Sequence, residues 1–176
     1  YLVYQACDLN ADGAEYLEDG LKLKGSSPED FYQRGRIYYY LSEYKNAEKE
    51  MKKAREKGYD QATVYLGKIY AENQEVDKAM TMYEECLEIE GLEAEGYNGQ
   101  AVCAASEGDY EKALSCIEKG LKQDDWEMNQ VLLFNQIVFY EKSMDFSSAR
   151  EKVTAYLEMY PGDKDAVREG DFLETR

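Results

Sequence analysis

The feature of the sequence that most constrains the fold is an alanine that recurs at nearly regular intervals. Ala47, Ala79, Ala113 and Ala149 are spaced 32, 34 and 36 residues apart, each after a short polar segment. A period of this length is typical of stacked supersecondary units, none of which can bury its apolar face alone. We therefore expect one domain over residues 1–176, built as an array of similar units.

The clearest unit predicts a pair of helices between residues 28 and 58. Ser27 can cap the first helix and Pro28 fits its first turn. Apolar and small residues then follow at three- and four-residue steps, which is the period of a helix. Ser42 is expected to end this helix and to cap the next, and Gly58 to end the second helix in a left-handed conformation. The unit is therefore an antiparallel hairpin with a very short turn.

Small residues at fixed places in the units indicate close helix crossings. Gly35, Gly67 and Ala101 occupy this place in the first helices, and the recurring alanines occupy it in the second helices. Side chains larger than alanine would push the helix axes apart where they cross. Large residues three or four positions away are expected to fill the space beside each crossing.

This pattern resembles the tetratricopeptide repeat family, because several family offsets agree at once in Leu66, Gly67, Tyr70, Ala79 and Tyr83. The resemblance implies an all-α fold, a right-handed α-α superhelix (solenoid) of helix hairpins. It implies a partial N-terminal repeat, four full repeats and a closing helix, at residues 1–25, 28–59, 60–93, 94–127, 130–162 and 163–176. The fourth repeat departs from the family pattern at Ile137 and Tyr156, where small residues are expected.

The two ends of the chain resemble fractions of a repeat. Tyr1–Ala6 resembles the tail of a first helix, and Ala14–Lys24 resembles a second helix. The chain starts without an initiating Met, and we expect a processed or excised piece. At the other end Asp163 can cap a last helix that closes the stack with a polar face.

The composition excludes several classes of function. The net charge is −16, so nucleic acid is not expected as a partner, because binding its backbone needs clustered Lys and Arg. An anionic membrane surface is disfavoured for the same reason, and no apolar run is long enough for insertion. The charge fits either solvated outer faces or an attraction for a basic partner.

No catalytic residue, metal site or cofactor is expected. Histidine is absent, which removes imidazole bases and ligands. The four cysteines have no metal-binding spacing and are expected to be reduced packing residues, with a Cys103–Cys116 bridge as the alternative. Asp8, Asn10, Asp12 and Gly13 only loosely resemble the start of a calcium loop.

The resemblance implies a binding surface on the first helices of the repeats. In the family these helices line a concave groove that holds an extended segment or a helix of a partner. The implied peptide-binding residues are Tyr32, Gln33, Arg36, Tyr39, Tyr40, Tyr65, Lys68, Asn98, Val102, Phe134, Asn135 and Val138. The Lys, Asn and Arg set of chaperone-binding members is absent, so chaperone tails are not expected as ligands.

Two interpretations of the aromatic half of this surface remain open. Tyr and Arg are frequent energetic anchors of interfaces, so Arg36 and Lys68 can meet a carboxylate of a peptide. Alternatively, Tyr39 and Tyr40 pack between repeats and the cations pair with neighbouring acids. Trp126 is likewise either an exposed anchor or, as we expect, a cover over the end of a helix pair.

The expected function is a non-catalytic scaffold that binds a protein or peptide, as one module of a larger bacterial-type protein or assembly. The alternatives are a structural spacer or self-assembly module, and a sensor of a small ligand or signalling peptide. The sequence leaves the partner, the oligomeric state and the compartment open, and both a cytoplasmic and an extracytoplasmic location fit.

Overall fold

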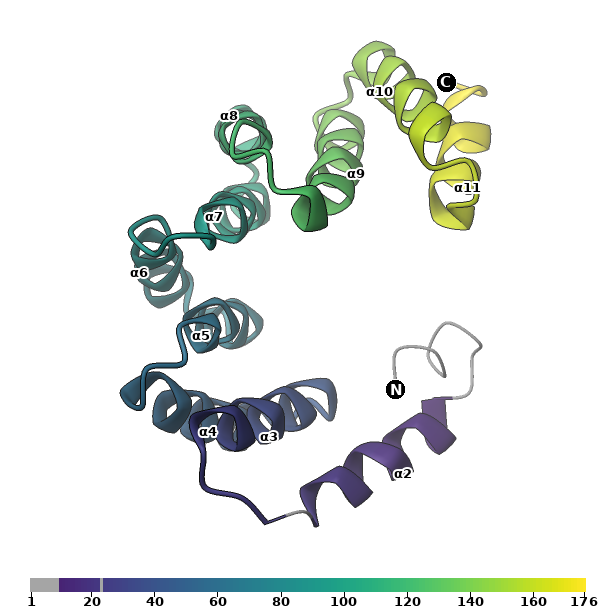
Figure 1. Cartoon of the computed structure of the whole chain (residues 1–176). Coiled ribbons are helices and arrows are strands. Elements are labelled where there is room, and N and C mark those ends of the chain that lie inside the picture. The colour runs from purple at the N-terminus through teal and green to yellow at the C-terminus, as the bar shows by residue number, and fades with distance from the viewer. Residues whose placement is uncertain (1–9, 23) are drawn as a thin grey trace. The chain divides into compact units, whose positions relative to one another are not determined.

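The computed structural model describes residues 10–22 and 24–176, and every regular element in these residues is an α-helix (Figure 1). The chain forms two compact units, Tyr1–Met82 and Tyr83–Arg176. Tyr1–Ala6, Cys7 and Asp8 of the sequence analysis lie outside the described residues. None of the helices in the described part combines the length and the apolar character needed to cross a membrane.

The helices follow one another along the chain, and α6 begins in the first unit and ends in the second. The first unit contains α2 (Asn10–Leu21), α3 (Pro28–Tyr40), α4 (Tyr44–Glu56), α5 (Gln61–Glu72) and the start of α6 (Val76–Cys86). The second unit continues with α7 (Glu93–Ser106), α8 (Tyr110–Leu121), α9 (Trp126–Lys142), α10 (Phe146–Met159) and α11 (Lys164–Leu173). Asp12 and Gly13 lie inside α2, so the loosely matching calcium loop is not a loop there.

Short polar side chains start several of the helices, as the sequence predicts for α3 and α11. The Ser27 hydroxyl accepts from the Asp30 amide at 3.1 Å, and the Asp30 carboxylate accepts from the Ser27 amide at 2.8 Å. This reciprocal pair satisfies two amides that the helix itself leaves unpaired. Asp163 caps α11 in the same sense, accepting from the amides of Asp165 and Ala166.

The turn inside each hairpin depends on one residue in the left-handed conformation. These residues are Ser42, Gln74, Gly108 and Met144, with φ of 59°, 62°, 82° and 63°. The following amide bonds back to the first helix, as from Glu43 to the Tyr38 carbonyl at 2.8 Å, which satisfies a helix-terminal carbonyl. The expectation that Ser42 caps α4 is therefore wrong: it lies in the turn, and Glu43 holds the cap position without a side-chain bond.

The hairpin of α3 and α4 is held by a close crossing and by a half-buried ion pair. A Cβ atom on Gly35 would lie 2.9 Å from the end of Met51, which is fully buried. Arg34 Nε bonds Glu50 at 3.0 Å across the two helices, and Lys53 bonds the other oxygen at 2.5 Å. Burial would raise the pKa of Glu50, but the bonds from Lys53 and Arg34 hold it below its usual range.

In the second unit, the end of α6 packs tightly against α7. Cβ atoms on Gly96 and Gly99 would meet the carbonyl oxygen and the ring of Tyr83, at 2.9 and 2.2 Å. Two cores follow, one between α7, α8 and α9 and one between α9, α10 and α11. Ile137 and Tyr156, which depart from the family pattern, are 0% and 1% exposed in the latter core, so larger side chains fill this hairpin instead of small ones.

Met144→Gly should raise the free energy of unfolding by about 1 kcal/mol, because an L-residue pays to hold the left-handed conformation that glycine adopts freely. Met144 is 75% exposed, so its side chain contributes little packing. Chemical denaturation followed by circular dichroism measures the change. Ser143→Gly is the control, because φ there is −78° and glycine has no steric advantage. A loss of stability in Met144→Gly would contradict the proposed cost of the turn.

Gly99→Ala should lower the free energy of unfolding by about 1–3 kcal/mol, because the added methyl overlaps the Tyr83 ring. This loss outweighs the gain of up to about 1 kcal/mol that alanine normally brings to a helix. Gly170→Ala is the matched helical control, since its Cβ would meet Leu157 at an ordinary 3.5 Å. Thermal unfolding of both variants measures the difference. Equal changes in stability would mean that α6 and α7 are not in close contact.

Candidate functional site

Five tyrosines of the first unit contact one another, and we name them the tyrosine cluster: Tyr32, Tyr39, Tyr40, Tyr59 and Tyr65. They come from α3, α5 and the loop before α5. The Tyr32 ring stacks on Tyr59 with centroids 4.5 Å apart and meets Tyr65 edge-on at 5.5 Å. Such ring pairs add stability beyond the area they bury, so the cluster forms a firm aromatic surface across the α3–α5 contact.

The Arg36 guanidinium lies over this surface. Its carbon is 5.6 Å from the centre of the Tyr32 ring and 5.8 Å from that of Tyr65. One terminal nitrogen donates to the Gln33 side chain at 3.3 Å, while Nε is buried without a hydrogen-bond partner. Within residues 10–22 and 24–176, no carboxylate pairs with Arg36. The surface therefore holds a guanidinium that has no carboxylate partner among the described residues and whose Nε atom lacks an acceptor.

At neutral pH the Arg36 guanidinium is positively charged and the tyrosine hydroxyls of the cluster are neutral. Burial, with the nearby Glu72 carboxylate, raises the pKa of Tyr39 to about 12. Burial and the Tyr40 hydroxyl, 3.4 Å away, raise the pKa of Tyr65 as well. Both phenols are thus protonated at neutral pH and can donate as well as accept.

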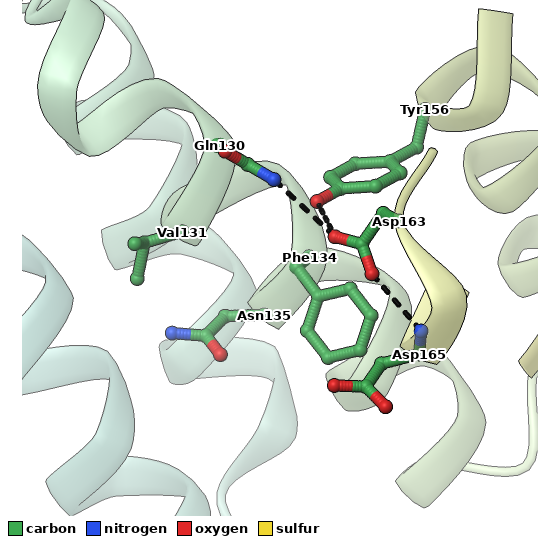
Figure 2. A pocket seen from close by; sticks show the side chains of 7 residues that line it. All are labelled: Gln130, Val131, Phe134, Asn135, Tyr156, Asp163 and Asp165. Atoms are coloured by element: carbon green, nitrogen blue, oxygen red, sulfur yellow. Dashed lines mark hydrogen bonds between the residues drawn. The ribbon is translucent and has the colours of Figure 1, made fainter. Parts of the chain in front are cut away.

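The second unit has a cavity of about 230 Å³ between α9 and the start of α11 (Figure 2). Its lining residues are Gln130, Val131, Phe134, Asn135, Tyr156, Asp163 and Asp165. We name it the α9–α11 pocket. The Phe134 ring meets the buried Tyr156 ring edge-on at 5.8 Å, which gives the pocket an aromatic wall.

Asp163 joins the three helices around this pocket. Its Oδ1 atom caps α11, and its Oδ2 atom accepts from the Tyr156 hydroxyl at 2.6 Å and from Gln130 at 3.3 Å (Figure 2). These bonds, the Tyr156 bond first, hold the pKa of Asp163 below its usual range. Burial and Asp163 in turn raise the pKa of Tyr156 to about 12. Asp163 therefore stays ionised, and all its hydrogen bonds are internal.

The structure places the twelve predicted site residues in two groups, one in each unit. Tyr65 is buried, at 8% exposure, while Gln33, Lys68 and Val102 are exposed and the rest are half-buried. Lys68 lies 4.9 Å from the Tyr65 ring. In the second unit Asn135 donates to Asn98 at 2.8 Å, which links α9 to α7. Phe134 and Asn135 line the pocket.

Sequence reasoning missed several residues of these sites. Tyr59 follows Gly58, whose left-handed φ of 85° marks the turn that leads to α5. The glycine in the sequence was the signal that could have placed Tyr59 beside the first helices. Gln130, Val131, Tyr156 and Asp165 line the pocket unpredicted, and Asp163 was expected only as a cap. Trp126 is 81% exposed, so the expectation that it covers a helix pair is wrong. Cys103 and Cys116 are free thiols, which excludes the alternative bridge.

Tyr156→Phe should lower the free energy of unfolding by about 1.5–3 kcal/mol, the contribution of a hydrogen bond to a charged group. Because the folded-state pKa of Asp163 lies below its usual value of 3.8, this contribution is complete between that pH and 10.0, the usual pKa of tyrosine. It is lost as the pH falls through the lowered value of Asp163 or rises through the raised value of Tyr156. Urea denaturation at several pH values measures it.

Tyr160→Phe is the matched control, since within the described residues its hydroxyl has no hydrogen bond and its ring also contacts Tyr156. A change within about 0.5 kcal/mol is expected there. Equal losses in the two variants would show that the Asp163 bond contributes nothing.

Solved structures with similar folds span most of the chain. A thermophilic TPR protein of Thermus thermophilus has a TM-score of 0.79 at 16% identity, over 99% of this chain and 95% of that one. YrrB, described as a TPR protein with an unusual peptide-binding site, has a TM-score of 0.60 at 20% identity, over 94% and 86%. At these identities the likeness shows the fold alone.

A third similar structure is the C-terminal part of a TPR repeat-containing protein from Cytophaga hutchinsonii, with a TM-score of 0.65 at 17% identity. The match covers 93% of this chain but 64% of that structure, so this chain spans less than two thirds of it. A search of curated proteins found no significant match.

Two sequence profiles, both described as tetratricopeptide repeat, match residues 32–91 and 94–125, together more than half of the chain. The expected resemblance and the all-helical fold are thereby confirmed. The chain belongs to the tetratricopeptide repeat family, whose fold is in general a non-catalytic scaffold for protein interactions.

Proposed function

We propose that the chain binds a polypeptide partner and that Arg36, held in the tyrosine cluster, bonds a carboxylate of that partner. The observation that carries this proposal is that the Arg36 guanidinium has no carboxylate partner within the described residues, its Nε atom having no acceptor at all. A buried charged donor without a partner is costly. A carboxylate can take two parallel bonds from a guanidinium, so an acidic side chain or a chain terminus is the fitting ligand group.

The absence of a carboxylate partner for Arg36 within the described residues is unusual in this chain. The net charge is −16, and several other Lys and Arg side chains of the first unit form ion pairs with carboxylates. These pairs are Arg34 with Glu50, Lys52 with Glu48, Lys53 with Glu50 and Lys78 with Glu75. Arg36 instead lies over two tyrosine rings, which attract the cation, while its Nε–H group stays without an acceptor. This arrangement favours a bound carboxylate over a purely structural role.

The surroundings of Arg36 fit peptide recognition. Tyrosine gives a large contact area at a small entropic cost, and its hydroxyl bonds backbone groups. Tyr32 and Tyr40 are half-buried and Gln33 is exposed, so parts of this surface remain open to a ligand. The buried Tyr65 ring packs against the rings of Tyr32 and Tyr39 and holds them in place, which agrees with a preorganised site.

In the second unit the proposed contacts come from α7 and α9. Val102 is 42% exposed and offers apolar area, and Asn98 and Asn135 offer amide groups that bond each other at 2.8 Å. Phe134 and Val138 are half-buried on the same helix as Asn135. YrrB is described as having a peptide-binding site, which supports peptide binding as a use of this fold.

An array of immobilised synthetic peptides, matched in pairs that differ by Glu against Gln, tests the proposal. The chain should retain the Glu member of some pairs, and Arg36→Met should weaken that retention by about tenfold or more, the loss of a charge-assisted bond. Methionine keeps an unbranched stem on the tyrosine rings, so the fold should survive.

Lys49→Met is the matched control, because it removes the same charge from an exposed position on α4 of the same unit. It should leave retention unchanged. Circular dichroism should give equal helicity for all three proteins. Equal retention of the Glu peptides by the parent and by Arg36→Met would rule out the proposed role of Arg36.

A further inference from the structure

The α9–α11 pocket has a size and shape that suit a single long side chain. Its volume is about 230 Å³, below the range of about 300–1,000 Å³ that is usual for sites of drug-sized ligands. Phe134 and the 43%-exposed Val131 give it apolar walls. Polar groups of Gln130, Asn135 and Asp165 stand around these walls (Figure 2).

The hydrogen bonds around the pocket occupy the side-chain amide nitrogens of Gln130 and Asn135 and leave their carbonyl oxygens as acceptors. The Gln130 amide nitrogen donates to Asp163, and the Asn135 amide nitrogen donates to Asn98. Within the described part of the chain, the carbonyl oxygens of Gln130 and Asn135 have no hydrogen-bond donor. The Tyr156 hydroxyl also donates to Asp163. A ligand that completes these groups must therefore bring donors.

The charge of the pocket favours a cation. Asp163 and Asp165 both line it, and the former is ionised but has no cationic partner among the residues described. Asp165 pairs with Arg168, and these side chains are 69% and 79% exposed, so a ligand can displace this weak surface pair. An anion at the start of α11 is disfavoured, because Asp163 already takes the first amides of that helix.

We propose that the α9–α11 pocket binds an arginine side chain of a partner polypeptide. The aliphatic stem lies along Val131 and the planar guanidinium stacks on Phe134, a contact that arginine makes better than lysine. The guanidinium then donates to the Asp165 carboxylate and to the Asn135 carbonyl oxygen. This inference rests on the proposed function only in that the occupant belongs to a polypeptide, and it concerns residues of the second unit alone.

A titration of the full chain with the peptide acetyl-Gly-Arg-Gly-amide, followed by NMR, tests the inference. The side-chain amide signals of Gln130 and Asn135 should shift, together with the backbone amide of Asp165. The same peptide with citrulline, which keeps the shape but lacks the charge, should bind about tenfold more weakly. The lysine peptide should also bind more weakly than the arginine peptide, and a glutamate peptide should produce no shift.

Asp165→Asn should lower the affinity for the arginine peptide by about tenfold and leave the affinity for the citrulline peptide unchanged. Asp171→Asn is the matched control, because it removes one charge from an exposed site of the same helix, and its affinity should equal that of the parent. Equal binding of citrulline or lysine, binding of glutamate, or no shift at the pocket residues would each overturn the assignment.

The outcome for this pocket is separable from the outcome for Arg36. Arg36→Met should leave the shifts caused by the arginine peptide unchanged, and a loss of those shifts would contradict the pocket as their source. If Glu peptides bind through Arg36 while the arginine peptide fails, this inference alone falls. If the arginine peptide binds at the pocket while Arg36→Met retains every Glu peptide, the proposed function of Arg36 alone falls.

Discussion

The chain reverses direction inside each hairpin within about three residues, and the packing of the helices depends on this reversal. One residue takes the left-handed conformation, and the next amide bonds back to the first helix. Five positions later stands an alanine with no exposed surface, as at Ala47 and Ala149. Because this separation is constant, the turn determines which face of the second helix meets the first. The tyrosine cluster and the α9–α11 pocket lie on helices oriented in this way.

The fold followed from the sequence where its causes are local. The cap at Ser27, the left-handed Gly58 and the buried alanines each have a short-range steric or hydrogen-bonding reason. The turn at Ser42 was missed because residue type alone gives no sign of a left-handed serine. Trp126 was misjudged because Asp125, which accepts from the next two amides and starts α9 there, was not recognised as the cap.

The sites were predictable only where one helix carries them. Tyr32 and Arg36 are one turn apart on α3, so the family frame brought them together. The pocket instead joins Gln130 to Asp163 across 33 positions. Asp163 was expected to cap α11, but capping uses only its Oδ1 atom. Which distant donors reach the Oδ2 atom depends on helix packing, and no spacing in the sequence encodes it.

The two surfaces offer opposite chemistry within one strongly acidic chain. A net charge of −16 repels an acidic segment at long range and attracts a basic one, although salt limits both effects to about 10 Å at 0.1 M ionic strength. An acidic ligand therefore needs a short-range, desolvated contact, and Arg36 between the rings of Tyr32 and Tyr65 provides one. An arginine side chain is also attracted by the field of the whole chain, which supports the proposal that a pocket with one exposed carboxylate binds it.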